Sequence, residues 1–144
     1  MRWILFSILS LCSSVSFSQH TADSLAIMTL IQNDYATYET LDIEAHRKNC
    51  TIDYILIENG EIWSIEQEAA YMKSLNEKSK RINQFDKVSV TVERSFAYVV
   101  YELKSQITRN NITKNYQWTE SVVLRKQSGA WKIALIHSTK VKEW

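Results

Sequence analysis

The sequence has no proline and only two glycines, Gly60 and Gly129, among its 144 residues. Domains of a multidomain chain are usually separated by linkers rich in these two residues, and no such stretch is present. There is also no internal repeat and no low-complexity tract. The length and the uniform composition therefore predict one globular domain.

An excess of charge of one sign is lacking as well. The chain carries 17 basic and 16 acidic residues, so its formal net charge is +1. Proteins that bind nucleic acid usually carry a concentrated basic surface. The balanced charge argues against a nucleic-acid partner.

A long apolar run is missing, but a short one opens the chain. Residues 1–18, MRWILFSILSLCSSVSFS, have the order of a secretory signal peptide: a positive Arg2, an apolar core, and small residues at Ser16 and Ser18. The apolar core is shorter than the ~20 residues that a membrane-spanning helix needs. We expect cleavage before Gln19, a mature domain of residues 19–144 without a membrane anchor, and a secreted or periplasmic location.

Cysteine is nearly absent. Only Cys12 and Cys50 occur, and the predicted cleavage removes Cys12. A single remaining cysteine cannot form a disulfide within the chain. We expect Cys50 to be a buried apolar side chain; an intermolecular disulfide or a reactive thiol is the alternative.

The first half of the mature chain has helical patterns. Residues 21–40 repeat apolar side chains at steps of three and four, and Asp42 can cap a short helix over 43–49. A strand is expected around 54–57, followed by a turn at Asn59-Gly60. Ser64 and Gln67 have the spacing of a capping box, which predicts a third helix up to about residue 77.

From residue 86 onward the pattern alternates as in β-strands. Tight turns are expected at residues 94–95, 110–111 and 128–129, which fix the register of three hairpins. This register places the following pairs side by side: Val88 with Tyr101, Val90 with Val99, Tyr101 with Glu120, Leu103 with Trp118, Leu124 with Ile133, Val122 with Leu135, and Glu120 with His137. Tyr101, Glu120 and His137 should then be neighbours on three adjacent strands.

Both faces of this sheet are apolar in the predicted register. A sheet that is apolar on both faces is normally covered on both. The few helices can cover one face, so we expect a second copy of the chain to cover the other. The predicted homodimer contact consists of Tyr98, Val100, Val123, Ala134 and Ile136.

Three segments carry a resemblance to a known family: LDIEAHRKN after the first helix, GEIWSIEQEAAYM into the third, and WTESVVLRKQSGAWKIALIHS at the end. The order of elements and these segments resemble the nuclear-transport-factor-2-like superfamily, and are most similar to its SnoaL-like branch. The resemblance implies an α+β cone, in which a strongly curved antiparallel sheet wraps about three N-terminal helices. It also implies a pocket at the open end of the cone. The superfamily includes enzymes and proteins that only bind or assemble, so the fold alone does not give the function.

The candidate site is the polar group on the inner wall of the predicted sheet. Polar side chains converging on an apolar wall are typical of a pocket for a small molecule. We expect a small apolar or amphipathic ligand to contact Tyr101, Leu103, Trp118, Glu120 and His137, with Tyr35, Tyr38 and Trp63 as further aromatic walls. Each of these aromatic residues could equally be part of the core.

Two other functions remain open. In the first, the chain is an acid/base enzyme in which His137 is the base, Glu120 orients it and Tyr101 donates to an oxyanion. In the second, Glu120 and His137 form a structural pair within an interaction or immunity-type protein. The three histidines lack the spacing of metal ligands, so no metal and no cofactor are expected.

Basic residues follow the third helix. Lys73, Lys78, Lys80 and Arg81 are most simply a solvated helix end, where positive charge suits the helix dipole. An anion-binding rim is the alternative interpretation.

Overall fold

The structure, a computed structural model, describes residues 12–75 and 77–143. It contains α1 (Cys12–Thr40), α2 (Ile43–Asn49), β1 (Cys50–Glu58), β2 (Glu61–Ser64), α3 (Ile65–Ser74), β3 (Lys80–Glu93), β4 (Phe96–Arg109), β5 (Ile112–Gln127) and β6 (Ala130–Glu143). The predicted α+β class is confirmed. Residues 1–11 of the predicted signal peptide lie outside the described residues, and cleavage before Gln19 stays a prediction. No helix in the described ranges has the length and apolar character required to cross a membrane.

The predicted helix caps are both present. The Asp42 carboxylate accepts a hydrogen bond of 3.0 Å from the backbone N–H of Ala45 at the start of α2. Ser64 and Gln67 form the complete capping box of α3. The helix ends at Ser74, earlier than predicted, and β3 already begins at Lys80.

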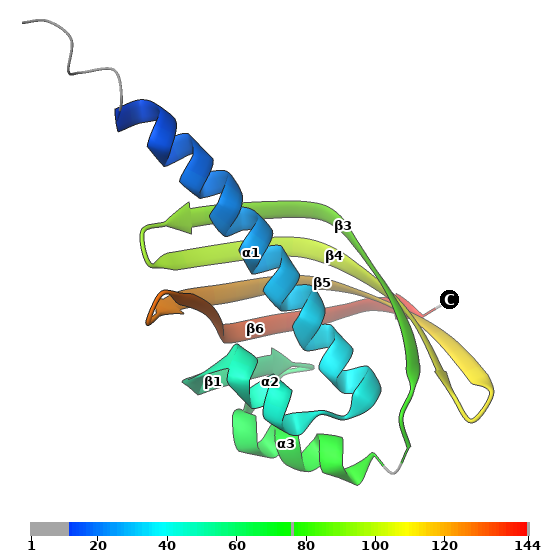
Figure 1. Ribbon diagram of the computed structural model, residues 1–144. Helices are drawn as coiled ribbons and strands as arrows, with labels where there is room; N and C mark the ends of the chain where they lie inside the picture. Colours follow the sequence, from blue (N-terminus) through cyan, green and yellow to red (C-terminus); the bar gives the residue numbers. More distant parts are fainter. Residues whose placement is uncertain (1–11, 76, 144) are drawn as a thin grey trace, which may run out of the picture.

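The six strands form one sheet in the order β2-β1-β6-β5-β4-β3 (Figure 1). The hairpins β3-β4, β4-β5 and β5-β6 are antiparallel as predicted, whereas β1 lies parallel to β6. A parallel pair requires a long crossover between its strands. Here the crossover consists of everything from β2 to β5, so the sheet is mixed.

Helix α1 crosses in front of the long strands and covers one face of the sheet (Figure 1). Ile27 and Ile31 of α1 are buried in the same cluster as Val99, Leu103 and Leu124 of the sheet. Each apolar side chain fully buried in this way stabilises the fold by roughly 1.5–3 kcal/mol. This cluster is the core of the domain, and it supports the wall from which the site side chains project.

All three predicted hairpin turns are present. Glu93 pairs with Phe96, Arg109 with Ile112, and Gln127 with Ala130. Asn110 and Asn111 have φ of 52° and 61°, the left-handed conformation that a two-residue hairpin turn demands. The predicted neighbours Tyr101–Glu120 and Leu103–Trp118 are also confirmed.

A bulge in β3 changes the predicted position of Val88. Lys87 and Val88 together lie opposite Tyr101, and Lys87 has a φ of 52°. The extra residue turns Val88 away from the core, so its side chain is 41% exposed. Phe85 takes the inward position, with its ring centroid 5.2 Å from that of Tyr101.

A second bulge, in β6, overturns the register predicted for the last hairpin. Leu124 faces Ile133 as predicted, but Val122 faces Ile136 rather than Leu135, because Ala134 is an extra residue in the strand. A slip of one residue exchanges the two faces of a strand. Beyond the bulge, Ile136 and Ser138 therefore point inward, and Leu135 and His137 point outward.

The outer face of the sheet differs from the prediction for the same reason. Tyr98 lies next to Val123, and Val123 lies next to Leu135, whereas Ile136 is buried on the inner face. Tyr98 remains 46% exposed and Val100 38% exposed, so this face is apolar and partly uncovered. A homodimer through this face stays a prediction. Sedimentation equilibrium of the purified protein tests it, because it measures the molar mass in solution.

Candidate functional site

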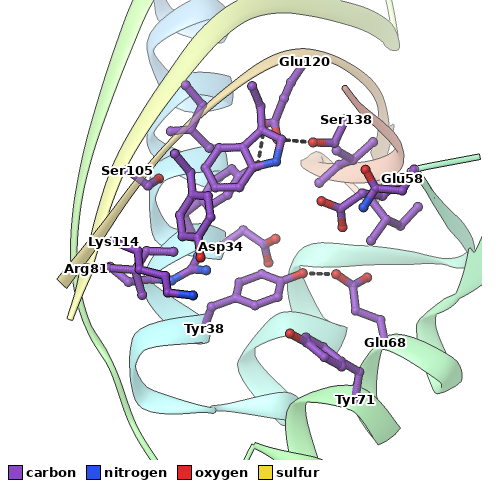
Figure 2. Close-up of a pocket in the computed structure, with 18 of the residues that line it drawn as sticks. Asp34, Tyr38, Glu58, Glu68, Tyr71, Arg81, Ser105, Lys114, Glu120 and Ser138 are labelled. Carbon is purple, nitrogen blue, oxygen red and sulfur yellow. Dashed lines mark hydrogen bonds between the residues drawn. The ribbon is translucent and has the colours of Figure 1, made fainter. Parts of the chain in front are cut away.

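A cavity of about 700 Å³ lies between α1, α3 and the inner face of the sheet. Ligand pockets for small molecules span roughly 300–1,000 Å³. Apolar side chains such as Leu103, Trp118 and Ile136 form part of its wall, and charged side chains form the rest (Figure 2). The wall is therefore mixed, whereas the sequence predicted a largely apolar one.

Most of the predicted ligand-contacting side chains line this cavity. They are Tyr35, Tyr38, Trp63, Leu103, Trp118 and Glu120. Tyr101 is not among the lining residues, because it is buried in the core beneath them. His137 is exposed and points to the other face of the sheet.

The predicted pair of Glu120 and His137 is wrong. The bulge at Ala134 places Ser138 opposite Glu120 and moves His137 opposite Ser121. The Ser138 hydroxyl donates a hydrogen bond of 2.8 Å to Glu120 Oε1. His137, the base of the predicted acid/base pair, therefore does not line the pocket.

Glu120 is the most enclosed carboxylate on the sheet side of the cavity. Its side chain is held by Ser138 and by the Tyr35 hydroxyl, which donates a 2.5 Å hydrogen bond to Oε2. Tyr101 approaches the same carboxylate without making a well-aligned hydrogen bond. Burial raises the pKa of Glu120, and the hydrogen bonds from Tyr35 and Ser138, together with the nearby Tyr101 hydroxyl, only partly oppose this effect.

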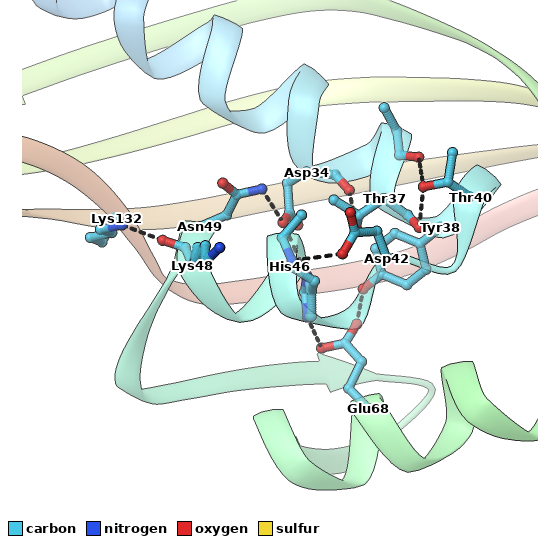
Figure 3. A network of polar contacts seen from close by, with 12 residues as sticks. Asp34, Thr37, Tyr38, Thr40, Asp42, His46, Lys48, Asn49, Glu68 and Lys132 are labelled. Atoms are coloured by element: carbon cyan, nitrogen blue, oxygen red, sulfur yellow. Dashed lines mark hydrogen bonds and ion pairs between the residues drawn. The ribbon is translucent and has the colours of Figure 1, made fainter.

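A buried ion network lies at the helix side of the cavity (Figure 3). His46 is fully buried, with Nδ1 3.0 Å from Asp34 Oδ1 and Nε2 3.3 Å from Glu68 Oε2. Asn49 donates to Asp34 at 2.9 Å, and the Tyr38 hydroxyl donates to Glu68. Asp34 and Glu68 also line the cavity, so the network forms part of its floor.

The two carboxylates decide the charge of His46. Burial alone would lower the pKa of His46, but the contacts with Asp34 and Glu68 outweigh burial and raise it to about 9. At neutral pH the imidazole is therefore protonated. One imidazolium between two carboxylates leaves a net negative charge at this end of the cavity.

The same region contains a potential set of metal ligands. Donor atoms of Asp34, His46 and Cys50 lie within 4.8 Å of one another. However, His46 Nδ1 is already engaged by Asp34, and burial raises the pKa of the Cys50 thiol, so a thiolate ligand is disfavoured. The ion network accounts for these residues, and Cys50 is the buried side chain that the sequence predicted.

Three basic residues, Arg81, Arg109 and Lys114, line the cavity, and Figure 2 shows Arg81 and Lys114 across it from Glu58. Arg81 of β3 faces Ile107 of β4, which faces Lys114 of β5, and Arg109 follows two residues after Ile107. Side chains at such positions project from one face of the sheet. The interpretation of Arg81 as part of a solvated helix end is wrong: Arg81 lies in a strand and lines the cavity.

Sequence reasoning did not single out Asp34, His46, Glu58, Glu68 or Arg109 as site residues. A signal for two of them was present. Asp34 lies three residues after Ile31, and Glu68 lies four residues before Met72, so each is an acid on the buried face of its helix. A buried acid needs a partner. His46 of α2 is that partner for both.

Comparison with known proteins agrees with this architecture. A family model described as a SnoaL-like domain matches residues 27–140. The chain belongs to the SnoaL-like domain family, within the nuclear-transport-factor-2-like superfamily. The family predicted from the sequence is thereby confirmed. No curated protein matches this SnoaL-like domain.

Solved structures share the fold of this SnoaL-like domain at low sequence identity. An NTF2-like protein from Cytophaga hutchinsonii is 15% identical with a TM-score of 0.70, over 80% of this chain and 95% of that chain. A ketosteroid isomerase-like protein from Erwinia carotovora atroseptica is 19% identical with a TM-score of 0.65, over 82% and 95%. The association domain of Caenorhabditis elegans CaMKII is 22% identical with a TM-score of 0.72, over 82% and 95%. The likeness extends to the fold alone.

Proposed function

We propose that this SnoaL-like domain binds a small amphipathic organic molecule in the cavity between its helices and its sheet. The observation that carries the proposal is the cavity of about 700 Å³, whose wall combines Trp118 and Leu103 with buried carboxylates. An apolar wall with a few fixed polar groups is the usual composition of a small-molecule site. The charged groups favour a ligand with polar ends over a purely apolar one.

A fragment screen by NMR tests this function. We expect several aromatic fragments to shift the indole N–H signal of Trp118 in a saturable way. Replacing Ile107, which lines the cavity, with tryptophan should narrow the cavity and weaken each hit at least tenfold. Gln106→Trp is the matched control: it adds the same ring on the adjacent, outward-facing residue, and should leave binding unchanged. If no fragment shifts Trp118, the domain does not bind small molecules here, and an interaction protein is the better interpretation.

Acid/base catalysis on the bound molecule is the second candidate function. It is favoured by Glu120, a cavity-lining carboxyl whose pKa is raised by burial and whose oxygen is fixed by Tyr35. A carboxyl group with a raised pKa can hold a proton and deliver it to a ligand oxygen. With His137 on the outer face, Glu120 itself would be the group that moves the proton, and Tyr35 and Ser138 would position it.

The titration of Glu120 can be measured through stability. Because its folded pKa is raised, Glu120 favours the fold fully below its unfolded pKa of about 4.5, and this stability is lost as pH rises through the folded value. We expect Glu120→Gln to remove this loss, so the variant should gain stability relative to wild type as pH rises. Urea unfolding of both proteins between pH 4 and 8 measures the difference. A difference that does not change with pH would show that Glu120 titrates normally, and the catalytic proposal would fail.

A further inference from the structure

The three basic side chains in the cavity have no carboxylate partner, whereas several other cations of the fold do. Arg47, Lys87, Lys104, Arg125 and Lys126 each form an ion pair with an acid. Within residues 12–75 and 77–143, no ion pair is formed by Arg81, Arg109 or Lys114. The positive charge at this end of the cavity is therefore not neutralised by a direct contact with the protein.

The two arginines are also incompletely hydrogen-bonded. The Nε atoms of Arg81 and Arg109 are buried and have no hydrogen-bond partner among the described residues. The Arg81 guanidinium lies over the Tyr38 ring, with Cζ 5.4 Å from the ring centroid, which holds its plane at the cavity wall. A buried donor that lacks a partner is costly, and a bound acceptor relieves that cost.

The charges of the cavity are separated in space. Figure 2 shows Arg81 and Lys114 together on one side, Glu58 and Glu68 on the opposite side, and Asp34 and Glu120 between the two sides. The apolar surfaces of Leu103 and Trp118 lie on the wall as well. A ligand that spans this cavity meets cations at one end and carboxylates at the other.

We propose that Arg81, Arg109 and Lys114 form an oxyanion subsite, which receives the carboxylate or phosphate group of an amphipathic organic ligand. Guanidinium groups bind oxyanions through paired, charge-assisted hydrogen bonds, and two arginines with free donors provide these. The apolar body of the ligand lies against Trp118 and Leu103, and Glu58 and Glu68 face its far end. The proposal rests on the proposed function and names the chemistry of its ligand.

Matched probes test the subsite. Naphthalene-2-carboxylate and naphthalene-2-carboxamide have nearly the same shape and differ in charge. We expect the carboxylate to bind at least tenfold more tightly than the carboxamide, as measured by NMR titration of the Trp118 indole at low salt. 2-Naphthyl phosphate shows which oxyanion is preferred, and tighter binding of either anion than of the carboxamide supports the subsite.

Variants then assign the preference to the arginines. Arg81→Gln and Arg109→Gln should each reduce the preference for the anion severalfold while the carboxamide binds as before. Lys80→Gln is the matched control, because it removes the same charge from the neighbouring residue of β3, whose exposed side chain points to the other face. Two separate arginine variants keep the test decisive if one of them fails to fold.

The outcomes separate the subsite from the proposed function. If the anions and the carboxamide bind equally well, or if the preference survives in both arginine variants, the subsite is wrong while small-molecule binding stands. If neither the anions nor the carboxamide bind, and the fragment screen yields no hit, both proposals are wrong.

Discussion

Replacing His46 with glutamine is expected to destabilise the fold by about 3–5 kcal/mol at pH 7, the cost of breaking a buried ion pair by removing one partner. Asp34 and Glu68 are almost fully buried and both depend on the His46 imidazolium for compensation. Glutamine can hydrogen-bond to one of them but supplies no positive charge. Urea unfolding followed by tryptophan fluorescence measures the loss.

His137 provides the matched control for this substitution. It is exposed on the outer face, so His137→Gln makes the same chemical change without a buried partner. We expect its effect on the free energy of unfolding to stay within about 0.5 kcal/mol, as for most surface substitutions. Equal effects of the two substitutions would mean that His46 is not the charged centre of the network.

The same network predicts how stability depends on pH. The pKa of His46 is raised from 6.5 to about 9 in the fold, so its contribution is complete below pH 6.5 and is lost as pH rises through 9. A shift of this size corresponds to about 3 kcal/mol. We expect wild type to lose stability across this range and His46→Gln to lose much less. Comparing the two proteins removes the contribution of other groups that titrate in both.

Deleting Ala134 is expected to cost at least about 4 kcal/mol or to prevent cooperative unfolding altogether. Without the extra residue, β6 beyond this point would exchange its faces, so Ile136 would leave the core and Ser138 would leave Glu120. Exposing a buried apolar side chain costs roughly 1.5–3 kcal/mol, and a buried group without its hydrogen bond about 1–3 kcal/mol more. Thermal and urea unfolding measure the change.

Deleting Val141 is the control for the deletion of Ala134. Val141 is the extra residue of a second irregularity in β6, between the pairs Gln117–Lys142 and Trp118–Lys140, and it is 54% exposed. Its removal shifts only the last residues of the strand, so we expect a loss below about 1 kcal/mol, as for most changes at the surface. If both deletions changed the free energy of unfolding equally little, the turn at Ser128-Gly129 would have rearranged to keep the register of β6. The bulge would then not determine which side chains of β6 point inward.

The turns and caps were predictable because their signals are local. Asn110 and Asn111 tolerate the left-handed backbone, and Ser64 with Gln67 satisfies a helix start, wherever these residues lie in a fold. The bulge at Ala134 was not predictable in this way. Residues 133–136 are all apolar, so an alternating pattern through Leu135 and one through Ile136 after a bulge fit the sequence equally well. The curvature of the whole sheet decides between them.

The site residues also divide into those that local sequence signals predict and those that they do not. The aromatic walls were predictable, since Tyr35, Tyr38 and Trp118 follow the periodicity of their own helix or strand. The ion network was not, because Asp34, His46 and Glu68 come from three separate helices and meet only in the folded chain. Arg81 was placed on a helix end because nothing in the sequence shows that α3 stops at Ser74 and that a strand begins six residues later.

The place of β6 in the sheet has a consequence for synthesis of the chain. It is the last strand in sequence, yet it lies between β1 and β5. Until the ribosome has delivered it, β1 and β5 have no neighbour on that side, and the two halves of the sheet cannot be joined. Non-local pairing of this kind makes folding slow and leaves exposed strand edges in the meantime. The nascent domain therefore cannot complete its sheet until nearly all of it has been made.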